Sequence, residues 1–444
     1  MNSEEKHVVN TSDLILISVD DHIAEPANMF DAHVPARFKE HAPRVVTCGD
    51  GTQQWYYGDI PGRNIGLNAV AGKPPEDYNI DPAAYSDMRP GCYDVHERVR
   101  DMNAGGQVAG LNFPNWPGFS GQVLCQGPDP ATNLVMVRAY NDWHVDEWCG
   151  SYPDRFIPCG ILPLFDATVA ASELRRLAAK GCHAVTFSEN PEGLGLPSIH
   201  SGYWDPLFKA ACDEGTVLCL HVGSSSRPPH TSSDVPASAV ITLTAAWTMG
   251  TLAELIWSSL WFRYPTLRFA LTEGDIGWIP YMLWRADQVF KQHHCWTGAS
   301  FPPHAQSASE VFRAHFLACF IADPTWLGSE WLSTDQICWE ADYPHSDGVW
   351  PHGPETIAGI LDGQPPDLID AVTHRNAMRA FRFDPISRRG RDGCTVASLR
   401  AQASDVQLFT PSAGRSAGTS GERWEQARSR LAGTATGNAS KETA

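Results

Sequence analysis

Four short apolar segments of this chain each end in carboxylates or histidines, and this repeated pattern constrains the fold more than any other feature. An apolar run that stops at polar turn residues is typical of a buried strand. In a parallel α/β barrel the C-terminal ends of the strands meet at one face, where the chemistry takes place. The pattern therefore predicts that distant parts of the chain meet at the mouth of a barrel. The polar residues at these ends are Asp20, His22, His221, Glu273, Asp342 and His345.

The rest of the chain predicts strands that alternate with helices. Such alternation favours a parallel sheet with right-handed crossovers. Eight units within residues 14–385 indicate a (β/α)8 TIM barrel with long loop insertions. A doubly wound open sheet is the alternative, which is weakened because no Gly-rich dinucleotide fingerprint follows the first strand. The predicted strands are residues 15–19, 108–113, 156–164, 184–187, 217–222, 267–272, 320–322 and 337–340.

Changes in composition indicate the domain organisation. Residues 1–13 form an N-terminal extension, and residues 14–385 form the catalytic barrel. Residues 45–92 are rich in Gly, Pro, Asp and Tyr, which predicts a lid-like insertion over the barrel mouth. Residues 386–444 are rich in Ser, Gly, Ala, Thr and Arg and poor in large apolar residues. We therefore predict a disordered C-terminal tail, in which residues 422–431 form at most a transient helix.

Net charge and cysteine usage restrict the partners and the compartment. The 444 residues carry 51 Asp and Glu against 33 Lys and Arg, a formal net charge of -18, which disfavours nucleic-acid binding. The 12 Cys contain no CxxC pair, so reduced core thiols in a cytoplasmic protein are favoured over a zinc ribbon. The polar N-terminus lacks a signal region, and the absence of a long apolar run predicts that nothing spans a membrane. The 16 Trp and 33 Pro suit either aromatic loops around an apolar ligand or a large core.

The polar strand ends supply the residue types that bind a metal ion. Asp20 and His22 are two positions apart on one strand, so both side chains point to the same face. His221 and Asp342 complete the three or four ligands that a mononuclear hydrolytic site needs. A buried carboxylate without a partner is costly, which also favours a cation. Carboxylate with imidazole suits Fe, Mn or Zn, and the ligand types alone do not choose among them.

The remaining polar residues would allow a second ion. Glu273 and His345 are left over, with Asp21 or Asp275 nearby. A mixed set of this size is what two metal ions need. Each residue also has a structural alternative. His221 would be a hydrogen-bonded core residue, Glu273 would pair with a nearby arginine, and His345 would be an exposed loop residue.

Four motifs resemble the amidohydrolase-2 (aminocarboxymuconate-semialdehyde decarboxylase-like) family. They are Ser18–Pro26, Leu220–Gly223, Thr272–Tyr281 and Ala341–His345, in that order. The resemblance implies a metal-dependent barrel whose relatives decarboxylate aromatic acids or hydrolyse C–C or C–N bonds. It also implies that four residues match the metal ligands of the family. These are Asp20, His22, His221 and Asp342.

Two departures from the family pattern point to one branch. The His-x-His motif of many members is Asp20-x-His22 here, and Glu273 stands near the position of their acid/base histidine. The pattern is similar to a branch that includes a TIM-barrel non-haem diiron monooxygenase of diterpenoid antibiotic (platensimycin and platencin) biosynthesis.

This resemblance implies a leading function and leaves two alternatives open. The leading prediction is a monooxygenase with two iron ions that hydroxylates an unactivated carbon of a bulky apolar, diterpenoid-like substrate. It needs O2 and an electron donor, with Asp342, Glu273 and His345 as catalytic residues and Asn115 and Trp116 lining the pocket. The first alternative is a hydrolase or non-oxidative decarboxylase with one Zn or Mn. The second is a non-catalytic, metal-stabilised binding barrel. A homodimer is one predicted assembly.

Overall fold

The structure is a computed structural model, and its strands account for the barrel predicted from the sequence. It describes residues 8–411 except residues 50, 79–81, 83, 226–231 and 233. The strands of the barrel are β1 (Ile17–His22), β5 (Ala109–Phe113), β6 (Phe156–Ile157), β7 (Cys159–Gly160), β8 (Ala184–Ser188), β9 (Val217–His221), β10 (Phe269–Thr272), β11 (Phe316–Phe320) and β12 (Ile337–Trp339).

Parallel pairing joins these strands in sequence order into a closed cylinder. One run pairs as β1-β5-β6 and the other as β7-β8-β9-β10-β11-β12. β6 and β7 are two parts of one strand, interrupted at Pro158, which has no N–H to donate. The other junction closes where the Asp342 N–H donates to the carbonyl of Asp20 at 2.8 Å, and the His22 N–H to the carbonyl of Tyr343 at 2.6 Å. The first and last strands are therefore neighbours.

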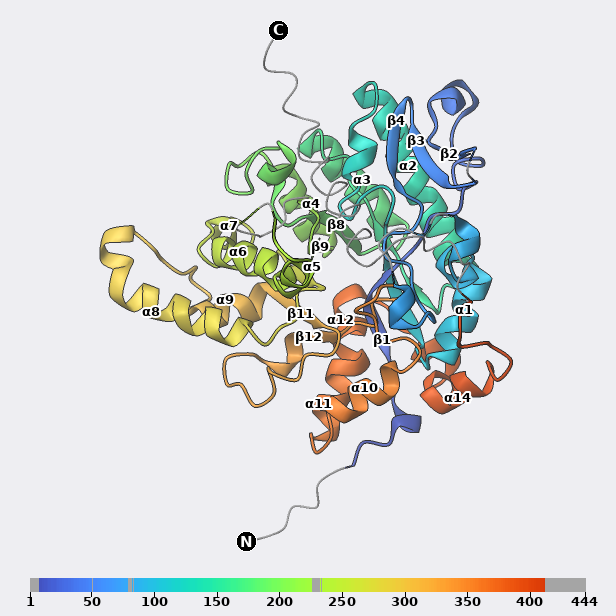
Figure 1. The fold of residues 1–444 in the computed structure, drawn as a ribbon. Helices are drawn as coiled ribbons and strands as arrows, with labels where there is room; N and C mark the ends of the chain where they lie inside the picture. The colour runs from blue at the N-terminus through green and yellow to red at the C-terminus, as the bar shows by residue number, and fades with distance from the viewer. Residues whose placement is uncertain are drawn as a thin grey trace.

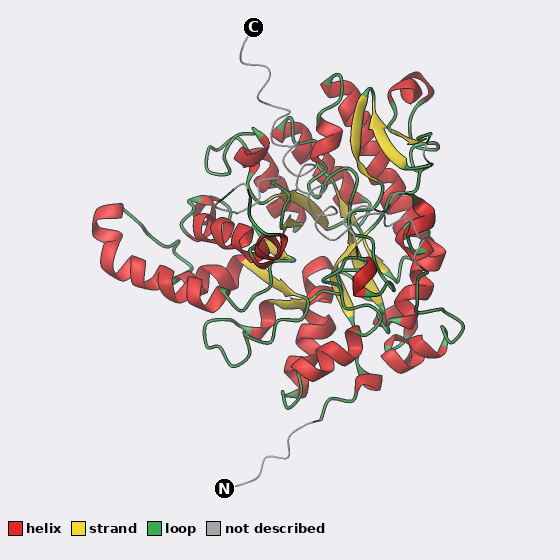
Figure 2. Ribbon diagram, in the orientation of Figure 1, coloured by secondary structure: helices red, strands yellow, loops and turns green. Residues whose placement is uncertain are grey.

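Helices surround the cylinder (Figures 1 and 2). The helices before the last strand are α1 (Val95–Ala104), α2 (Pro130–Asp142), α3 (Ala167–Ala179), α4 (Asp205–Glu214), α5 (Ala237–Thr242), α6 (Thr244–Ile256), α7 (Leu260–Arg263), α8 (Ile279–Thr297) and α9 (Ala308–His315). Those after it are α10 (Gly353–Ile360), α11 (Pro366–Asp370), α12 (Asn376–Phe381), α13 (Ile386–Arg389) and α14 (Val396–Ala401). α8 extends away from the body of the molecule (Figure 1).

The two faces of each strand pack against different cores, and this places the polar strand ends. In β9, Val217 and Cys219 belong to the core inside the cylinder, whereas Leu218 and Leu220 pack with the outer helices. Side chains alternate along a strand, so His221 follows Val217 and Cys219 on the inner face. The same alternation brings the other polar strand ends to the interior of the barrel mouth.

The seventh strand lies earlier in the chain than predicted. The sequence predicts a weak strand at residues 320–322, whereas β11 occupies Phe316–Phe320. Every residue of β11 is buried, so the segment has no alternation of polar and apolar residues to mark its beginning. The segment was therefore indistinguishable from the end of the preceding helix.

The insertion after β1 contains its own small antiparallel sheet. Its strands are β2 (Arg44–Thr47), β3 (Gln53–Tyr57) and β4 (Ile60–Asn64), seen at the upper right of Figure 1. Trp55 on β3 is fully buried and stacks on Trp116 with ring centroids 4.7 Å apart. This aromatic contact anchors the sheet to the barrel. Five positions of the predicted lid-like insertion lie outside the described residues, namely 50, 79–81 and 83.

The C-terminal part of the chain is ordered further than predicted. The sequence predicts a disordered tail from residue 386, but residues 386–411 carry α13 and α14 and a final extended segment. Val396 and Leu399 are buried, and the Val396 N–H donates to the carbonyl of Leu14 at 2.9 Å. A few apolar side chains in a polar stretch are enough to dock it on the barrel. Residues 412–444, including the predicted transient helix at 422–431, lie outside the described residues.

One stretch is long and apolar enough to cross a membrane by length and composition. It is Ala237–Ile256, with a mean hydropathy of 1.5 and 28% of its most apolar window buried. The stretch is interrupted by Ser, Thr, Gly and Glu, so it is not an unbroken apolar run. A core helix passes the same test, so this stretch alone does not indicate a membrane protein.

Candidate metal centre

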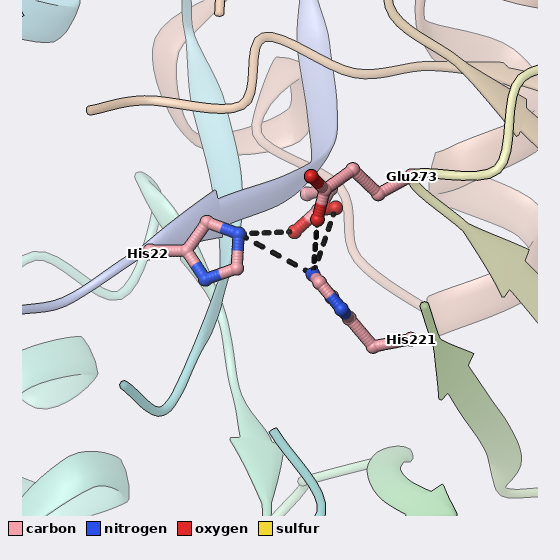
Figure 3. A group of neighbouring side chains, drawn as sticks. His22, His221 and Glu273 are labelled. Atoms are coloured by element: carbon pink, nitrogen blue, oxygen red, sulfur yellow. Dashed lines mark hydrogen bonds and ion pairs between the residues drawn. The ribbon is translucent and has the colours of Figure 1, made fainter. Parts of the chain in front are cut away.

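The structure brings all six predicted metal-binding residues together inside the barrel mouth. His22 ends β1 and His221 ends β9, and their Nε2 atoms face each other at 3.3 Å. Figure 3 shows that Glu273, from the loop after β10, points to the same place. Its Oε2 lies 2.9 Å from the His221 Nε2. His22 and His221 are 1% and 0% exposed, so this is a buried cluster.

Two aspartates surround the histidine pair. The Asp20 Oδ1 lies 3.4 Å from the His22 Nε2, and the Asp20 Oδ2 lies 3.4 Å from the His221 Nε2. The Asp342 Oδ1 lies 3.3 Å from the His22 Nε2 and 2.9 Å from the His345 Nδ1. These distances are those of ion pairs. Neither oxygen of either aspartate has a hydrogen-bond partner among the described residues.

The donors fit a metal ion. Four carboxylate oxygens of the two aspartates and the His345 Nε2 are buried without a hydrogen bond in the described part of the chain. Leaving such groups unpaired is costly, whereas one divalent cation satisfies several of them at once. Two nitrogens about 2.1 Å from one ion lie roughly 3.3 Å apart when the angle between them is near ~100°. The separation of the two histidine Nε2 atoms matches that geometry.

The donors form two overlapping groups within which the ligand atoms lie close enough to share an ion. The first contains Asp20, His22, His221 and Glu273, and the second contains His22, Glu273, Asp342 and His345. Both groups use His22, whose single inward nitrogen binds one ion. The groups are therefore alternative positions for an ion rather than two independent sites.

Burial and mutual charge perturb the protonation of these residues. Burial raises the pKa of Asp342 well above its usual value, and the nearby Glu273 and Asp20 carboxylates add to the effect. Burial also raises the pKa of Asp20, against the opposing influence of His221. Burial would lower the pKa of His221, but the Asp20 and Glu273 carboxylates outweigh it and raise that pKa well above 6.5. So many carboxylates close together favour a cation among them.

Backbone conformation directs two of the carboxylates into the cluster. Glu273 and Asp342 have φ of 58° and 52°, the left-handed region that residues other than glycine seldom adopt. Such conformations persist only where the surroundings hold them. Both oxygens of the buried Glu340 accept the Glu273 N–H, each at 3.2 Å. Glu340 therefore fixes the turn that carries Glu273.

Sequence reasoning missed Glu340 and the aromatic residues around the histidines. Glu340 is two positions before Asp342, so the alternation along a strand was a signal that it faces inward. The Phe119 ring lies 4.1 Å from the His221 ring, and the His345 ring stacks on His22 at 3.9 Å between centroids. Nothing in the sequence pattern indicates Phe119, which lies in a loop.

The structure decides between the alternatives for three residues. Glu273 pairs with His221 and not with a nearby arginine. His345 is 8% exposed, so it is not an exposed loop residue. Asp21 points away from the cluster, because its side chain accepts hydrogen bonds from the Gln107 side chain at 2.7 Å and the Tyr343 N–H at 3.1 Å.

Asn115 and Trp116, predicted to line the substrate pocket, lie outside the donor cluster. Their N–H groups donate to the two oxygens of the Glu25 carboxylate at 2.8 and 2.9 Å. Trp116 is fully buried against Trp55. In this structure both residues connect the barrel to the insertion, and their contact with a substrate stays a prediction.

Comparison with known proteins shows the family of the chain. The family model described as amidohydrolase matches residues 132–383, more than half of the chain. A search of curated proteins finds no match.

Solved structures share the barrel. An amidohydrolase from Mycobacterium avium subsp. paratuberculosis is 19% identical with a TM-score of 0.66, over 83% of this chain and 98% of that chain. 2,6-Dihydroxybenzoate decarboxylase from Rhizobium is 19% identical with a TM-score of 0.53, over 83% and 98%. 5-Carboxyvanillate decarboxylase from Novosphingobium aromaticivorans, with bound manganese, is 18% identical with a TM-score of 0.59, over 84% and 98%. These likenesses confirm the predicted TIM-barrel fold.

The prediction of a diiron monooxygenase, and with it an oxidoreductase, is wrong. The solved structures described above are decarboxylases and an amidohydrolase. The sequence contains enough donor residues for two ions, which is why two ions were predicted. In the structure these residues form one cluster, whose two donor groups share His22. O2 and an electron donor were predicted as partners only for that reaction.

Proposed function

Because the chain belongs to the amidohydrolase family, we propose that it is a metal-dependent enzyme that removes a carboxyl group from an aromatic acid without using oxygen. The observation that carries this proposal is the buried Asp342 carboxyl beside the donor cluster. It lies within 3.3 Å of His22 and 2.9 Å of His345, and both its oxygens are free of hydrogen bonds among the described residues. A carboxyl group in this setting can hold a proton and deliver it.

One divalent ion, manganese or zinc, would be held by the first donor group, Asp20, His22, His221 and Glu273. When bound, such an ion supplies positive charge that polarises a substrate oxygen. The solved 5-carboxyvanillate decarboxylase contains manganese, which supports that choice here. The predicted pair of iron ions has no support from the donor groups, which are alternatives.

Decarboxylation of an aromatic acid needs a proton at a defined carbon. The bond between the ring carbon and the carboxyl carbon breaks, CO2 leaves, and the electron pair stays on the ring carbon. A proton then replaces the lost group, so the reaction consumes one proton and involves no oxidation. Asp342 is placed to donate that proton, since burial favours its protonated form. His345, in contact with it through Nδ1, can restore the proton afterwards.

The test is release of CO2 under nitrogen. Manganese-loaded protein is incubated with 5-carboxyvanillate or 2,6-dihydroxybenzoate, and CO2 and the decarboxylated arene are measured. We expect Asp342→Asn to lower the rate at least about a hundredfold, as expected for loss of an acid catalyst, while metal content stays near wild type. Asp367→Asn, on a side chain that is 96% exposed, is the control and should leave the rate unchanged.

The alternative result is also informative. No CO2 from either acid with any divalent metal, together with hydrolysis of an amide or ester substrate, would refute the decarboxylase and favour the hydrolase. Activity equal to wild type in Asp342→Asn would refute the role of that residue. The substrate we propose is a small aromatic acid, and the net charge of -18 argues against nucleic acid as a partner. The homodimer and the cytoplasmic location stay predictions.

A further inference from the structure

A cavity of about 270 Å³ lies beside the donor cluster and shares His345 with it. The His345 ring stacks on His22, and its Nε2 is buried without a hydrogen bond in the described part of the chain. The other walls are mostly aromatic rings and prolines, among them Tyr343 and Trp350. A space of this size and lining suits a single substituted aromatic ring.

Lys73 is the buried cation of this cavity. The residue is only 9% exposed and lines the cavity. Burial lowers its pKa, and the acidic neighbours Asp87 and Asp77 act against this. The ammonium is not among the buried atoms that lack a hydrogen bond, so it still reaches water, and a ligand that displaces this water must supply a negative partner. A ligand with an anionic group would supply that partner.

The C-terminal segment holds the loop that carries Lys73. Thr410 donates from its N–H to the carbonyl of Gly72 at 2.9 Å and from its hydroxyl to the carbonyl of Ala71 at 2.8 Å. Gly72 has φ of 75°, and a Cβ there would lie 2.6 Å from the Thr410 Oγ1, so only glycine allows this close approach. Leu408 of the same segment lines the cavity. These contacts with the C-terminal segment therefore fix the backbone next to Lys73.

We propose that this cavity receives a second anionic substituent of the substrate and that Lys73 pairs with it. The proposal rests on the proposed decarboxylase and narrows its substrates to aromatic acids with two negative groups. One group is lost as CO2 at the donor cluster, and the other remains at Lys73. An acid with a single carboxylate would leave the ammonium unpaired and would bind more weakly.

The test compares two probes on manganese-loaded protein, isophthalate with two carboxylates and benzoate with one. Dissociation constants are measured by calorimetry for the wild type and for Lys73→Met, Lys73→Gln and Lys73→Arg. We expect the wild type to prefer isophthalate by at least about tenfold, the neutral variants to lose that preference, and the arginine variant to keep most of it. Lys291→Met, at an exposed lysine of α8, is the control. Circular dichroism checks that each variant folds, and Lys73→Gln replaces Lys73→Met if the latter does not.

The outcomes separate this proposal from the proposed function. Equal binding of both probes by the wild type, or an undiminished preference in both neutral variants, would overturn the anion site. If the protein releases CO2 but its preference for isophthalate does not depend on Lys73, the anion site alone is overturned. A preference that depends on Lys73, in a protein that releases no CO2 from any aromatic acid, would support the anion site and overturn the reaction.

Discussion

Glu25 is one of several buried carboxyl groups that make the stability of the protein depend on pH. It is fully buried, and its two oxygens accept the N–H groups of Asn115 and Trp116. Burial raises its pKa from 4.5 to about 7, although the two backbone hydrogen bonds act in the opposite direction. The carboxyl group therefore loses its proton at a higher pH in the folded protein than in the unfolded chain.

We expect Glu25 to make the protein less stable as pH rises between 4.5 and about 7. In this interval the folded state binds more protons than the unfolded state, so the free energy of unfolding falls as pH rises. Glu25→Gln removes the titration, and its Tm should change less than that of the wild type over the same interval. Glu192→Gln, at an exposed glutamate, should behave as the wild type does. An unchanged pH profile in Glu25→Gln would show that other groups, such as Asp21, set the dependence.

At the scale of single elements, α14 lies in the segment that the sequence predicts to be a disordered tail. Leu399 of α14 is fully buried, whereas Leu408, a few residues later, is 47% exposed. We expect Leu399→Ala to lower the free energy of unfolding by about 2–5 kcal/mol, because it leaves a cavity. Leu408→Ala should cost less than about 1 kcal/mol. Chemical denaturation of the two variants measures both values, and similar small losses would mean that α14 is not docked.

Most of the barrel could be predicted from local patterns, because each strand end combines an apolar run with polar turn residues. The metal-binding residues followed from those ends, since parallel strands deliver their C-termini to one face. β11 was misplaced because a strand buried on both faces carries no alternation, and α14 was missed because Val396 and Leu399 are isolated in a polar stretch. Tertiary contacts decide such cases. Phe119 and Lys73 reach the site through loops, whose course no local pattern reveals.

At the scale of the whole molecule, the donor cluster links metal binding to folding. An ion that binds the folded protein but not the unfolded chain stabilises it by about 2.7 kcal/mol when the free metal is a hundredfold above its Kd. We therefore expect manganese to raise the Tm of protein treated with a chelator.

Two variants make this result specific. His221→Ala removes a donor whose Nε2 contacts three of the other ligands, and its Tm should not respond to manganese. His304→Ala, at an exposed histidine away from the cluster, should respond as the wild type does. An equal increase in all three proteins would mean that manganese binds elsewhere.

The junction between the first and last strands has a consequence during synthesis. The Asp342 N–H reaches the carbonyl of Asp20, so donors from near the beginning and the end of the barrel lie side by side. A nascent chain still inside the ribosome before residue 345 holds Asp20 and His22 without Asp342 and His345. The first donor group, Asp20, His22, His221 and Glu273, is therefore synthesised before Asp342, which joins it only when the first and last strands meet.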